Sequence, residues 1–433
     1  MNIQFIKEFI KKKFISDSIL AIAGHGFVGV SGLIINSLIG LYFSTEVLGI
    51  FNQGLSIYLL LSLLANCGIM ISAQKHASQY LENNESLKQV FSNAFMATAI
   101  ISILISFLSY YIFSSYPNLF KSKDVLEFST LVCMALPFFS LNKTMNNFMV
   151  GLRRMKIYSG IRVFRWSLII LGIIIVCLNH SDFMLIPFIL LYTELVLFII
   201  LMIYSIPYWG KISLSNLKIH ITFGLKNILA ALVDDIGIRM PILIIGYVSG
   251  NVEAGIFAYV LSFARSILLI PQAIQKSFNP IFTKNWFKNQ HIKNEINISK
   301  VFKYSGLTLI PVLTCLYIFF IAYTYLLMPN EYLKGHIILL ILMIGMSTIY
   351  LFGPFATFLI MTDKLRANFL RVSISTILNI SLIFLLIYDY GNIGVAIAIS
   401  TSMLLNVFIM NYLYKRDINI NLFKNTIFSI KNA

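Results

Sequence analysis

Charged residues are scarce in this sequence: they make up 12% of its 433 residues, whereas 58% of the residues are hydrophobic. Soluble globular domains carry about 25% charged residues. Polar stretches are also scarce, since no gap between apolar segments is long enough for a separate soluble domain. Such a chain cannot cover itself with a polar surface, which excludes a soluble globular protein and predicts a membrane protein.

Cysteine is rare as well, and the four cysteines show no metal-ligand spacing. The sequence also lacks a glycine-rich nucleotide-binding loop, and its outer loops carry no carboxylate pair or histidine cluster. These absences argue against a metalloprotein, a nucleotide-driven pump and an enzyme. We therefore expect no catalytic residues, no metal site and no cofactor.

Long apolar runs dominate the sequence, and a membrane-spanning helix needs about 20 mainly apolar residues. The chain contains twelve such runs and is predicted to be an all-α polytopic membrane protein. The runs are 18–43, 47–72, 91–113, 125–150, 160–179, 183–207, 227–249, 253–278, 303–327, 335–360, 368–388 and 393–414.

The formal charge of +16 is distributed unevenly along the chain. If the N-terminus is cytoplasmic and the twelve helices alternate, nearly all lysines and arginines outside the spans fall on the inner side. Only Lys121, Lys123 and Lys334 fall on the outer side. This is the bias of the positive-inside rule. It predicts cytoplasmic termini, a bacterial inner membrane and contact with membrane lipids. Because topology explains the positive charge, we expect no nucleic-acid partner.

The sequence contains an internal repeat. Residues 39–56 align without a gap to residues 245–262, with seven identities in eighteen positions. Residues 148–156 resemble residues 358–366 in the same way, and both segments run from a fourth span into a short basic loop. A six-helix repeat inserts both copies with the same orientation. We therefore predict two pseudo-symmetric six-helix lobes, an N-terminal lobe over 1–215 and a C-terminal lobe over 216–433, with a linker at 208–226.

Several short motifs in these spans resemble one transporter family. They are Leu48–Gln53, Gly68-Ile69, Lys75–Tyr80, Asp235 to Gly246 and Ala254–Tyr259. Together with the length and the two lobes, they resemble the polysaccharide repeat-unit, or O-antigen, flippases of the multidrug/oligosaccharidyl-lipid/polysaccharide exporter superfamily. Lipid II flippases of that superfamily usually carry two further helices, which this chain lacks.

The resemblance implies a flippase that carries an undecaprenyl-diphosphate-linked oligosaccharide from the cytoplasmic to the periplasmic leaflet. Movement would follow alternating access, coupled to H⁺ or Na⁺. A polysaccharide polymerase and a chain-length regulator are the implied protein partners. A multidrug or cation antiporter of the same superfamily is the alternative, although cation exporters favour acidic cavities.

Charged side chains inside the spans are the candidate site residues, because each costs about 2.5–3.5 kcal/mol on insertion scales. Arg239, Arg265 and Lys143 would present positive charge to the diphosphate, since guanidinium and ammonium groups both bind phosphate. Asn146 and Asn147 lie near Lys143 on one helical face and would join the substrate site. A simpler interpretation is that Asp235 pairs with Arg239 and that Lys143 reaches the membrane interface.

Four acidic or titratable residues are candidates for ion coupling: Asp234, Asp235, Glu194 and His25. A buried carboxylate can exchange a proton, and histidine titrates near neutral pH. Structural roles compete with this interpretation. Glu194 and Arg265 could pair with each other or with helix ends, and His25 lies among glycines that allow close helix packing.

Overall fold

The computed structural model describes residue 24 and residues 26–426, and this part of the chain is helical without any β-strand. Its residues form two compact units. The first contains residues up to Phe43 together with Ile50–Leu232, and the second contains Ser44–Gly49 together with the chain from Val233 onwards. The division falls inside one helix, α9 (Leu214–Val248). The predicted lobe boundary at residue 215 separates the sequence repeats and stays a prediction.

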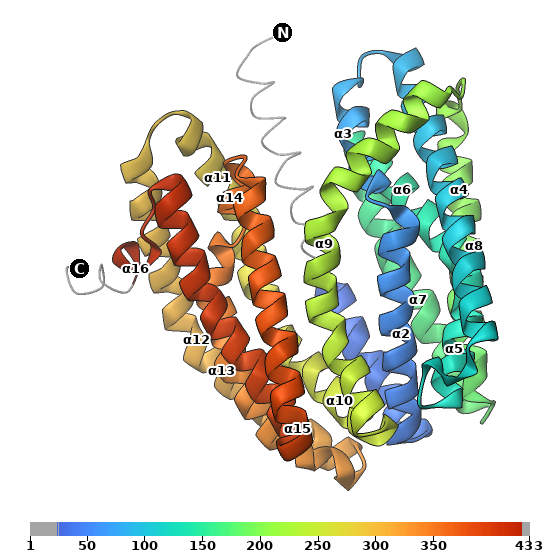
Figure 1. The fold of residues 1–433 in the computed structure, drawn as a ribbon, viewed down its shortest axis with the longest axis vertical. Coiled ribbons are helices and arrows are strands. Elements are labelled where there is room, and N and C mark those ends of the chain that lie inside the picture. The colour runs from blue at the N-terminus through green and yellow to red at the C-terminus, as the bar shows by residue number, and fades with distance from the viewer. Residues whose placement is uncertain (1–23, 25, 427–433) are drawn as a thin grey trace. The chain divides into compact units, whose positions relative to one another are not determined.

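The first unit is a helical bundle, blue to green in Figure 1. Its helices after Gly26–Tyr42 are α2 (Thr45–Asn66) from Ile50 onwards, α3 (Ile69–Gln79), α4 (Asn84–Ser115), α5 (Lys123–Val132), α6 (Leu136–Gly151), α7 (Met155–Leu178), α8 (Ile186–Ser205) and the first part of α9. The predicted linker 208–226 is mostly wrong, because α9 already begins at Leu214. Its first turns bury Leu217 and His220 and are thus held as helix by packing.

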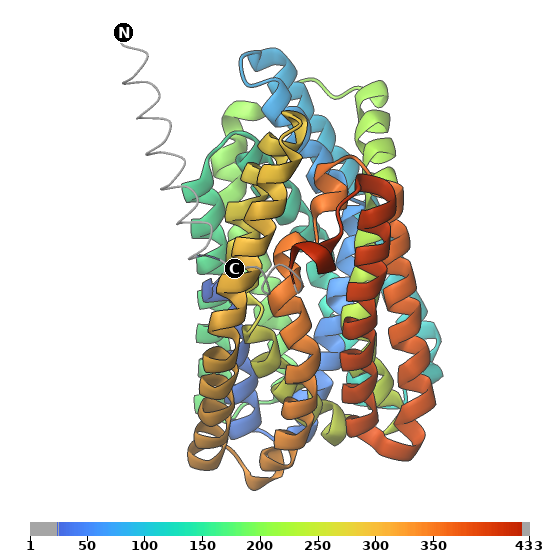
Figure 2. The same cartoon turned by 90° about the vertical axis from the view of Figure 1, so that its left-hand side faces the viewer.

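The second unit is a separate bundle, yellow to red in Figure 2. It holds the end of α9, α10 (Asn251–Ser266), α11 (Leu269–Phe287), α12 (His291–Leu327), α13 (His336–Phe352), α14 (Phe358–Met361), α15 (Leu365–Ile418) and α16 (Leu422–Asn425). Both views show α15 turning back on itself. The turn lies at Gly391, whose φ of 53° and ψ of −133° interrupt the helix and make two antiparallel helices of it.

The helices account for the twelve predicted spans. Nine helices of the described part are long and apolar enough to cross a membrane. The shorter Gly26–Tyr42 adds one, and α9, whose apolar part carries three charged residues, adds another. The last comes from α15, which is two helices joined at Gly391. The fold is therefore that of a multi-pass, all-α membrane protein.

Several predicted spans are made of two helices rather than one. The second span is broken at Cys67 and Gly68, whose φ angles of 49° and 71° are left-handed. The first part of α9 packs against this break so closely that a Cβ on Gly224 would overlap the carbonyl oxygen of Cys67. Breaks inside a membrane are tolerated where protein, not lipid, surrounds the backbone. The eighth span is likewise divided between α10 and α11.

The structure supports the second repeat correspondence in atomic detail. Arg153 and Asp363, 210 positions apart, both adopt left-handed backbone conformations, with φ of 57° and 59°. The next residue in each copy closes the turn with an equivalent bond, Arg154 N to Met149 O at 2.9 Å and Lys364 N to Leu359 O at 2.7 Å. The two equivalent positions therefore share one turn geometry, a common helix C-terminal motif that also occurs at His180 and Asn289.

The first repeat correspondence is visible as a reciprocal contact within the second unit. Segment Ser44–Gly49 packs against the start of α10. A Cβ on Gly49 would overlap the carbonyl oxygen of Asn251, and a Cβ on Gly255 would overlap that of Thr45. Thr45 and Asn251 are equivalent in the repeat, as are Gly49 and Gly255. The glycine of each copy therefore faces the other copy at the same position, as in a two-fold symmetric contact. This explains why glycine stands at position 49 and again at position 255.

Candidate functional site

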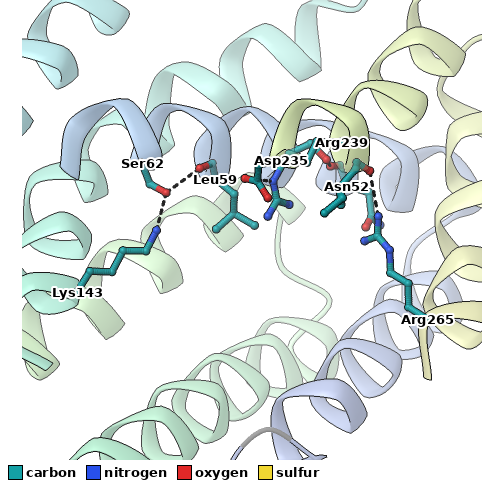
Figure 3. Close-up of polar contacts among 9 residues, drawn as sticks. Asn52, Leu59, Ser62, Lys143, Asp235, Arg239 and Arg265 are labelled. Carbon is teal, nitrogen blue, oxygen red and sulfur yellow. Dashed lines mark hydrogen bonds and ion pairs between the residues drawn. The ribbon is translucent and has the colours of Figure 1, made fainter. Parts of the chain in front are cut away.

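Lys143 lies on α6 in the first unit, where its ammonium group is held by a hydroxyl group and an aromatic ring. Its Nζ donates to Ser62 Oγ at 2.9 Å, and Ser62 in turn donates to the carbonyl oxygen of Leu59 (Figure 3). The same Nζ lies 4.3 Å from the centroid of the Phe139 ring. Cation–π contacts of this kind strengthen when water is excluded. Lys143 is therefore fixed within the bundle rather than extended along its surface.

Glu194 on α8 is fully buried and has two partners from neighbouring helices. Arg165 on α7 approaches it with Nε 2.6 Å from Glu194 Oε1. Asn142 on α6 donates to Glu194 Oε2 at 2.8 Å and to its backbone oxygen at 2.9 Å. Within the first unit, Glu194 therefore has Arg165 as its ion-pair partner, a residue that is not among the predicted site residues. The coupling role of Glu194 stays a prediction.

Phe139 connects these two polar groups. The Arg165 guanidinium lies 4.5 Å from the ring that Lys143 also contacts, and Tyr58 stacks on Phe139 at 5.1 Å. An aromatic ring has a negative face that attracts cations. The first unit therefore concentrates two cations around one buried ring.

The two predicted asparagines near Lys143 differ in their contacts. Asn147 donates its side-chain amide to the backbone oxygen of Lys143 at 2.8 Å, within the same helix. Asn146 is buried, and its Oδ1 has no hydrogen-bond partner among the described residues. A buried acceptor without a donor costs free energy. Asn146 is therefore the better placed of the two to accept a hydrogen bond from a ligand.

Asp235, Arg239 and Arg265 come together in the second unit (Figure 3). Arg239 Nε lies 2.8 Å from Asp235 Oδ2, one turn earlier on α9, as the sequence spacing predicted. Arg265, on α10, donates to the carbonyl oxygen of Ile238 at 3.0 Å. Within the described part of the chain, no carboxylate forms an ion pair with Arg265. Its charge is thus held next to an existing ion pair without being neutralised by direct contact.

Asp234 faces a different place, a cavity of about 320 Å³ inside the second unit. Arg371 also lines this cavity, with its terminal nitrogens 3.3 Å from Asn406 Oδ1 and 3.2 Å from Asn368 Oδ1. The Arg371 Nε is buried and has no acceptor among residues 26–426. The other polar lining residues are Gln272, Gln275 and Thr348. This mixture of donors and acceptors suits a polar, hydroxyl-bearing group better than an apolar one.

Two of these functional candidates, Arg165 and Arg371, are absent from the residues that the sequence predicts. Both lie near the inner ends of the predicted spans 160–179 and 368–388, where they count among the basic residues of the cytoplasmic side. A sequence signal for them exists, because each arginine is followed by a long apolar stretch of the same helix. Of the predicted residues, His25 lies outside the described part. No group of three potential metal ligands occurs in the described part.

The fold is similar to that of solved transporters. A multidrug resistance MATE family transporter of the MOP superfamily, in an inward-facing conformation, is 14% identical and has a TM-score of 0.72, with 91% of this chain and 94% of that one covered. The lipid II flippase MurJ, in an inward closed conformation, is 15% identical and has a TM-score of 0.74, with 93% and 87% covered. The MATE multidrug transporter DinF-BH is 14% identical, with a TM-score of 0.67 and 95% and 96% covered. At such identities the likeness establishes the fold, which is the two-lobe, twelve-helix fold predicted from the repeat.

Sequence comparison supplies the family. No curated protein sequence matches the chain significantly. Residues 15–287, more than half of the chain, match the family described as polysaccharide biosynthesis protein. The match covers every predicted site residue, from His25 to Arg265. The chain therefore belongs to the polysaccharide biosynthesis protein family of membrane proteins.

Proposed function

We propose that the protein is a flippase that moves an undecaprenyl-diphosphate-linked oligosaccharide repeat unit from the cytoplasmic to the periplasmic leaflet of a bacterial inner membrane. The family match supports a role in polysaccharide biosynthesis. The fold is shared with a lipid II flippase and with multidrug transporters, which supports transport of a cargo over its chemical conversion. Alternating access between the two lobes would carry the polar head group while the lipid tail stays in the bilayer.

The observation that carries this proposal is Arg265. A guanidinium group within a membrane-spanning helix is costly, yet in the described structure it is held by a backbone carbonyl and not by a carboxylate. Such a group retains N–H donors and charge for an anion. In the second unit we propose Arg265 and Arg239 as diphosphate-binding residues. In the first unit we propose Lys143 as a phosphate-binding residue, with Asn146 and Asn147 as hydrogen-bonding residues for phosphate or sugar.

The cavity around Asp234 supports a second feature of the function, ion coupling. Asp234 is exposed to the cavity, whereas Asp235 and Glu194 are engaged by arginines. An accessible carboxylate can exchange H⁺ or Na⁺ more readily than one held in an ion pair. We therefore rank Asp234 first among the coupling candidates Asp234, Asp235, Glu194 and His25. A polymerase and a chain-length regulator would act on the delivered repeat unit.

Replacing Arg265 tests the assignment. We expect Arg265→Ala to lower translocation about ten- to a hundredfold, because a hydrogen bond to a charged group contributes about 1.5–3 kcal/mol. Arg265→Lys should keep part of the activity, since the charge remains. The measurement is flipping of the lipid-linked oligosaccharide in proteoliposomes, with and without an imposed H⁺ or Na⁺ gradient, and surface polysaccharide in a complemented deletion strain.

Lys334→Ala is the matched control, because it removes one exposed positive charge far along the chain from the site. Membrane levels of all variants are compared by immunoblot. Normal translocation by Arg265→Ala at normal protein level would contradict the anion site. Flux that responds to neither gradient would contradict coupling but leave the flippase function standing.

A multidrug or cation antiporter is the alternative, and the similarity to a multidrug transporter over 91% of the chain supports it. Such a protein would export a cationic dye in a H⁺- or Na⁺-dependent manner. Dye export by the purified protein, together with unchanged surface polysaccharide in the deletion strain, would favour this alternative over the flippase.

A further inference from the structure

A groove of about 540 Å³ runs along the first turns of α12 in the second unit. It is lined by Glu295, Ile296, Ser299, Lys300, Lys303 and Tyr304 of α12 and by Asn425 of α16, which contacts α12. None of these residues belongs to the charged site described above. The spacing of the α12 residues places them on one face of the helix. The groove is therefore a continuous feature of the outside of this bundle.

The groove carries positive charge. Lys300 and Lys303 are both exposed, and neither forms an ion pair within the described part of the chain. Glu295 is the only acidic residue among the described lining residues, which leaves a net positive charge in the groove. Two ammonium groups one turn apart, with the hydroxyl of Tyr304 beside them, provide the donors that a phosphate group requires.

The same face of α12 continues into exposed apolar residues. Leu307, Ile310 and Ile318 have 66%, 72% and 61% of their surface exposed. They follow Lys303 over fifteen residues, which span about 22 Å along a helix. The whole helix has 37 residues, so at about 55 Å it is longer than a hydrocarbon core of about 30 Å. Its lysine-bearing end therefore lies at head-group level when Leu307 to Ile318 lie in hydrocarbon.

We propose that this groove is a binding site for an anionic phospholipid. The phosphate lies between Lys300 and Lys303, and the acyl chains follow Leu307, Ile310 and Ile318. Charge complementarity selects an anionic head group, and the apolar face that continues from the groove selects a lipid over free phosphate. The groove shares no residue with the proposed substrate-binding residues, and a bound lipid would anchor the end of α12 at the membrane surface.

The test is lipid retention by the purified full-length protein, measured by native mass spectrometry with phosphatidylglycerol and phosphatidylcholine of identical acyl chains. We expect selective retention of phosphatidylglycerol. Lys300→Ala/Lys303→Ala should weaken it about thirtyfold, because each lysine near a membrane surface contributes about 1 kcal/mol. Lys288→Ala/Lys293→Ala is the matched control, since it removes the same charge from exposed positions outside the groove.

Three results would overturn the proposal. Equal weakening in the control pair would mean that only net surface charge matters. Equal retention of phosphatidylcholine would remove the role of the anionic head group. Displacement of the lipid by millimolar inorganic phosphate would show an anion site without a lipid preference. If the alanine pair is not monodisperse, Lys300→Gln/Lys303→Gln gives the same comparison, and none of these measurements depends on flippase activity.

Discussion

At the scale of single residues, charge in the membrane-spanning helices is held by partners that are distant in sequence. Glu194 is fully buried, and its partners Arg165 and Asn142 come from two other helices. Arg265 is held by a carbonyl 27 residues away. Between described residues of the predicted spans, the pair Asp235 and Arg239 is local, and it agrees with the prediction from its spacing. Local pairs follow from helix geometry, whereas distant pairs depend on which helices become neighbours.

Glu194 should be more important for stability than an exposed carboxylate. Glu194→Gln leaves Arg165 as an uncompensated buried charge, which costs about 3–5 kcal/mol when one partner of a buried ion pair is removed. We expect a clear fall in the thermal stability of the detergent-solubilised protein, measured by fluorescence-detected size-exclusion chromatography after heating. Exposed Glu82→Gln is the control. Unchanged stability of Glu194→Gln would contradict this interpretation. So would a double variant, Arg165→Met/Glu194→Met, that is less stable than Glu194→Gln, because it removes both partners of the ion pair.

A histidine pair in the first unit should make one helix contact sensitive to pH. His220 Nδ1 lies 2.8 Å from Ser72 Oγ, and the His220 and His76 rings are 5.5 Å apart. Burial, with a smaller contribution from His76, lowers the pKa of His220 from 6.5 to about 4, and burial also lowers the pKa of His76, which lies near Lys75. A lowered folded-state pKa favours the neutral form. The contact is therefore fully stable above pH 6.5 and weakens as the pH falls towards 4.

Hydrogen exchange measures this weakening directly. Between pH 6.5 and 4.5, opening of α3 and of the first turns of α9 should become up to about tenfold more favourable per pH unit, after correction for the intrinsic exchange rate. His220→Gln should remove most of this dependence, because glutamine does not titrate. The same pH dependence in that variant would show that His220 is not the responsible group.

At the scale of helices, glycines decide where elements approach and turn. Gly391 lets α15 fold back into two spans through a backbone conformation that other residues rarely adopt. Gly49 and Gly255 allow two repeat-equivalent segments to cross at backbone contact. Gly49 and Gly255 are among the identities that reveal the repeat, but no sequence pattern indicates that the two copies contact each other.

Adding a methyl group at this crossing should separate the helices. Gly255→Ala places a Cβ against the carbonyl oxygen of Thr45, and Gly49→Ala places one against that of Asn251. Backbone cannot yield as a flexible side chain does, so both variants should lose thermal stability. Gly306→Ala in α12 is the control, since nothing lies within 4 Å of its added Cβ and alanine favours helix by about 1 kcal/mol. Equal stability of all three variants would exclude a tight crossing.

At the scale of the whole molecule, the distribution of charge predicts the orientation in the membrane. The helices agree with twelve spans, and an even number places both termini on the same side. The basic loops predict that this side is cytoplasmic, with Lys121 and Lys334 on the opposite side. Orientation is a property of the chain and its membrane together, so it requires a test in cells.

Cysteine labelling provides that test. Three of the four native cysteines are buried and Cys315 is exposed, so a variant without them is the starting point. We expect Lys121→Cys and Lys334→Cys to react with a membrane-impermeant maleimide in intact cells. Lys288→Cys should react only after permeabilisation. The opposite pattern would reverse the predicted topology.

The amino-acid sequence alone predicts a membrane protein with twelve spans, an internal repeat and a family resemblance. Hydrophobic length, charge bias and glycine position are properties that each segment carries by itself, so they can be recognised without the fold. It also identifies the charges within α6, α8, α9 and α10, but not Arg165 of α7 or Arg371 of α15. The partners of several buried charges follow from the folded structure instead: Arg165 for Glu194, the Ile238 carbonyl for Arg265, and a cavity shared by Asp234 and Arg371. The physical reason is that apolar helices pack equally well in many arrangements. The partners of these three charges are therefore fixed by how the helices pack together, whereas a pair such as Asp235 and Arg239 follows from its spacing along one helix.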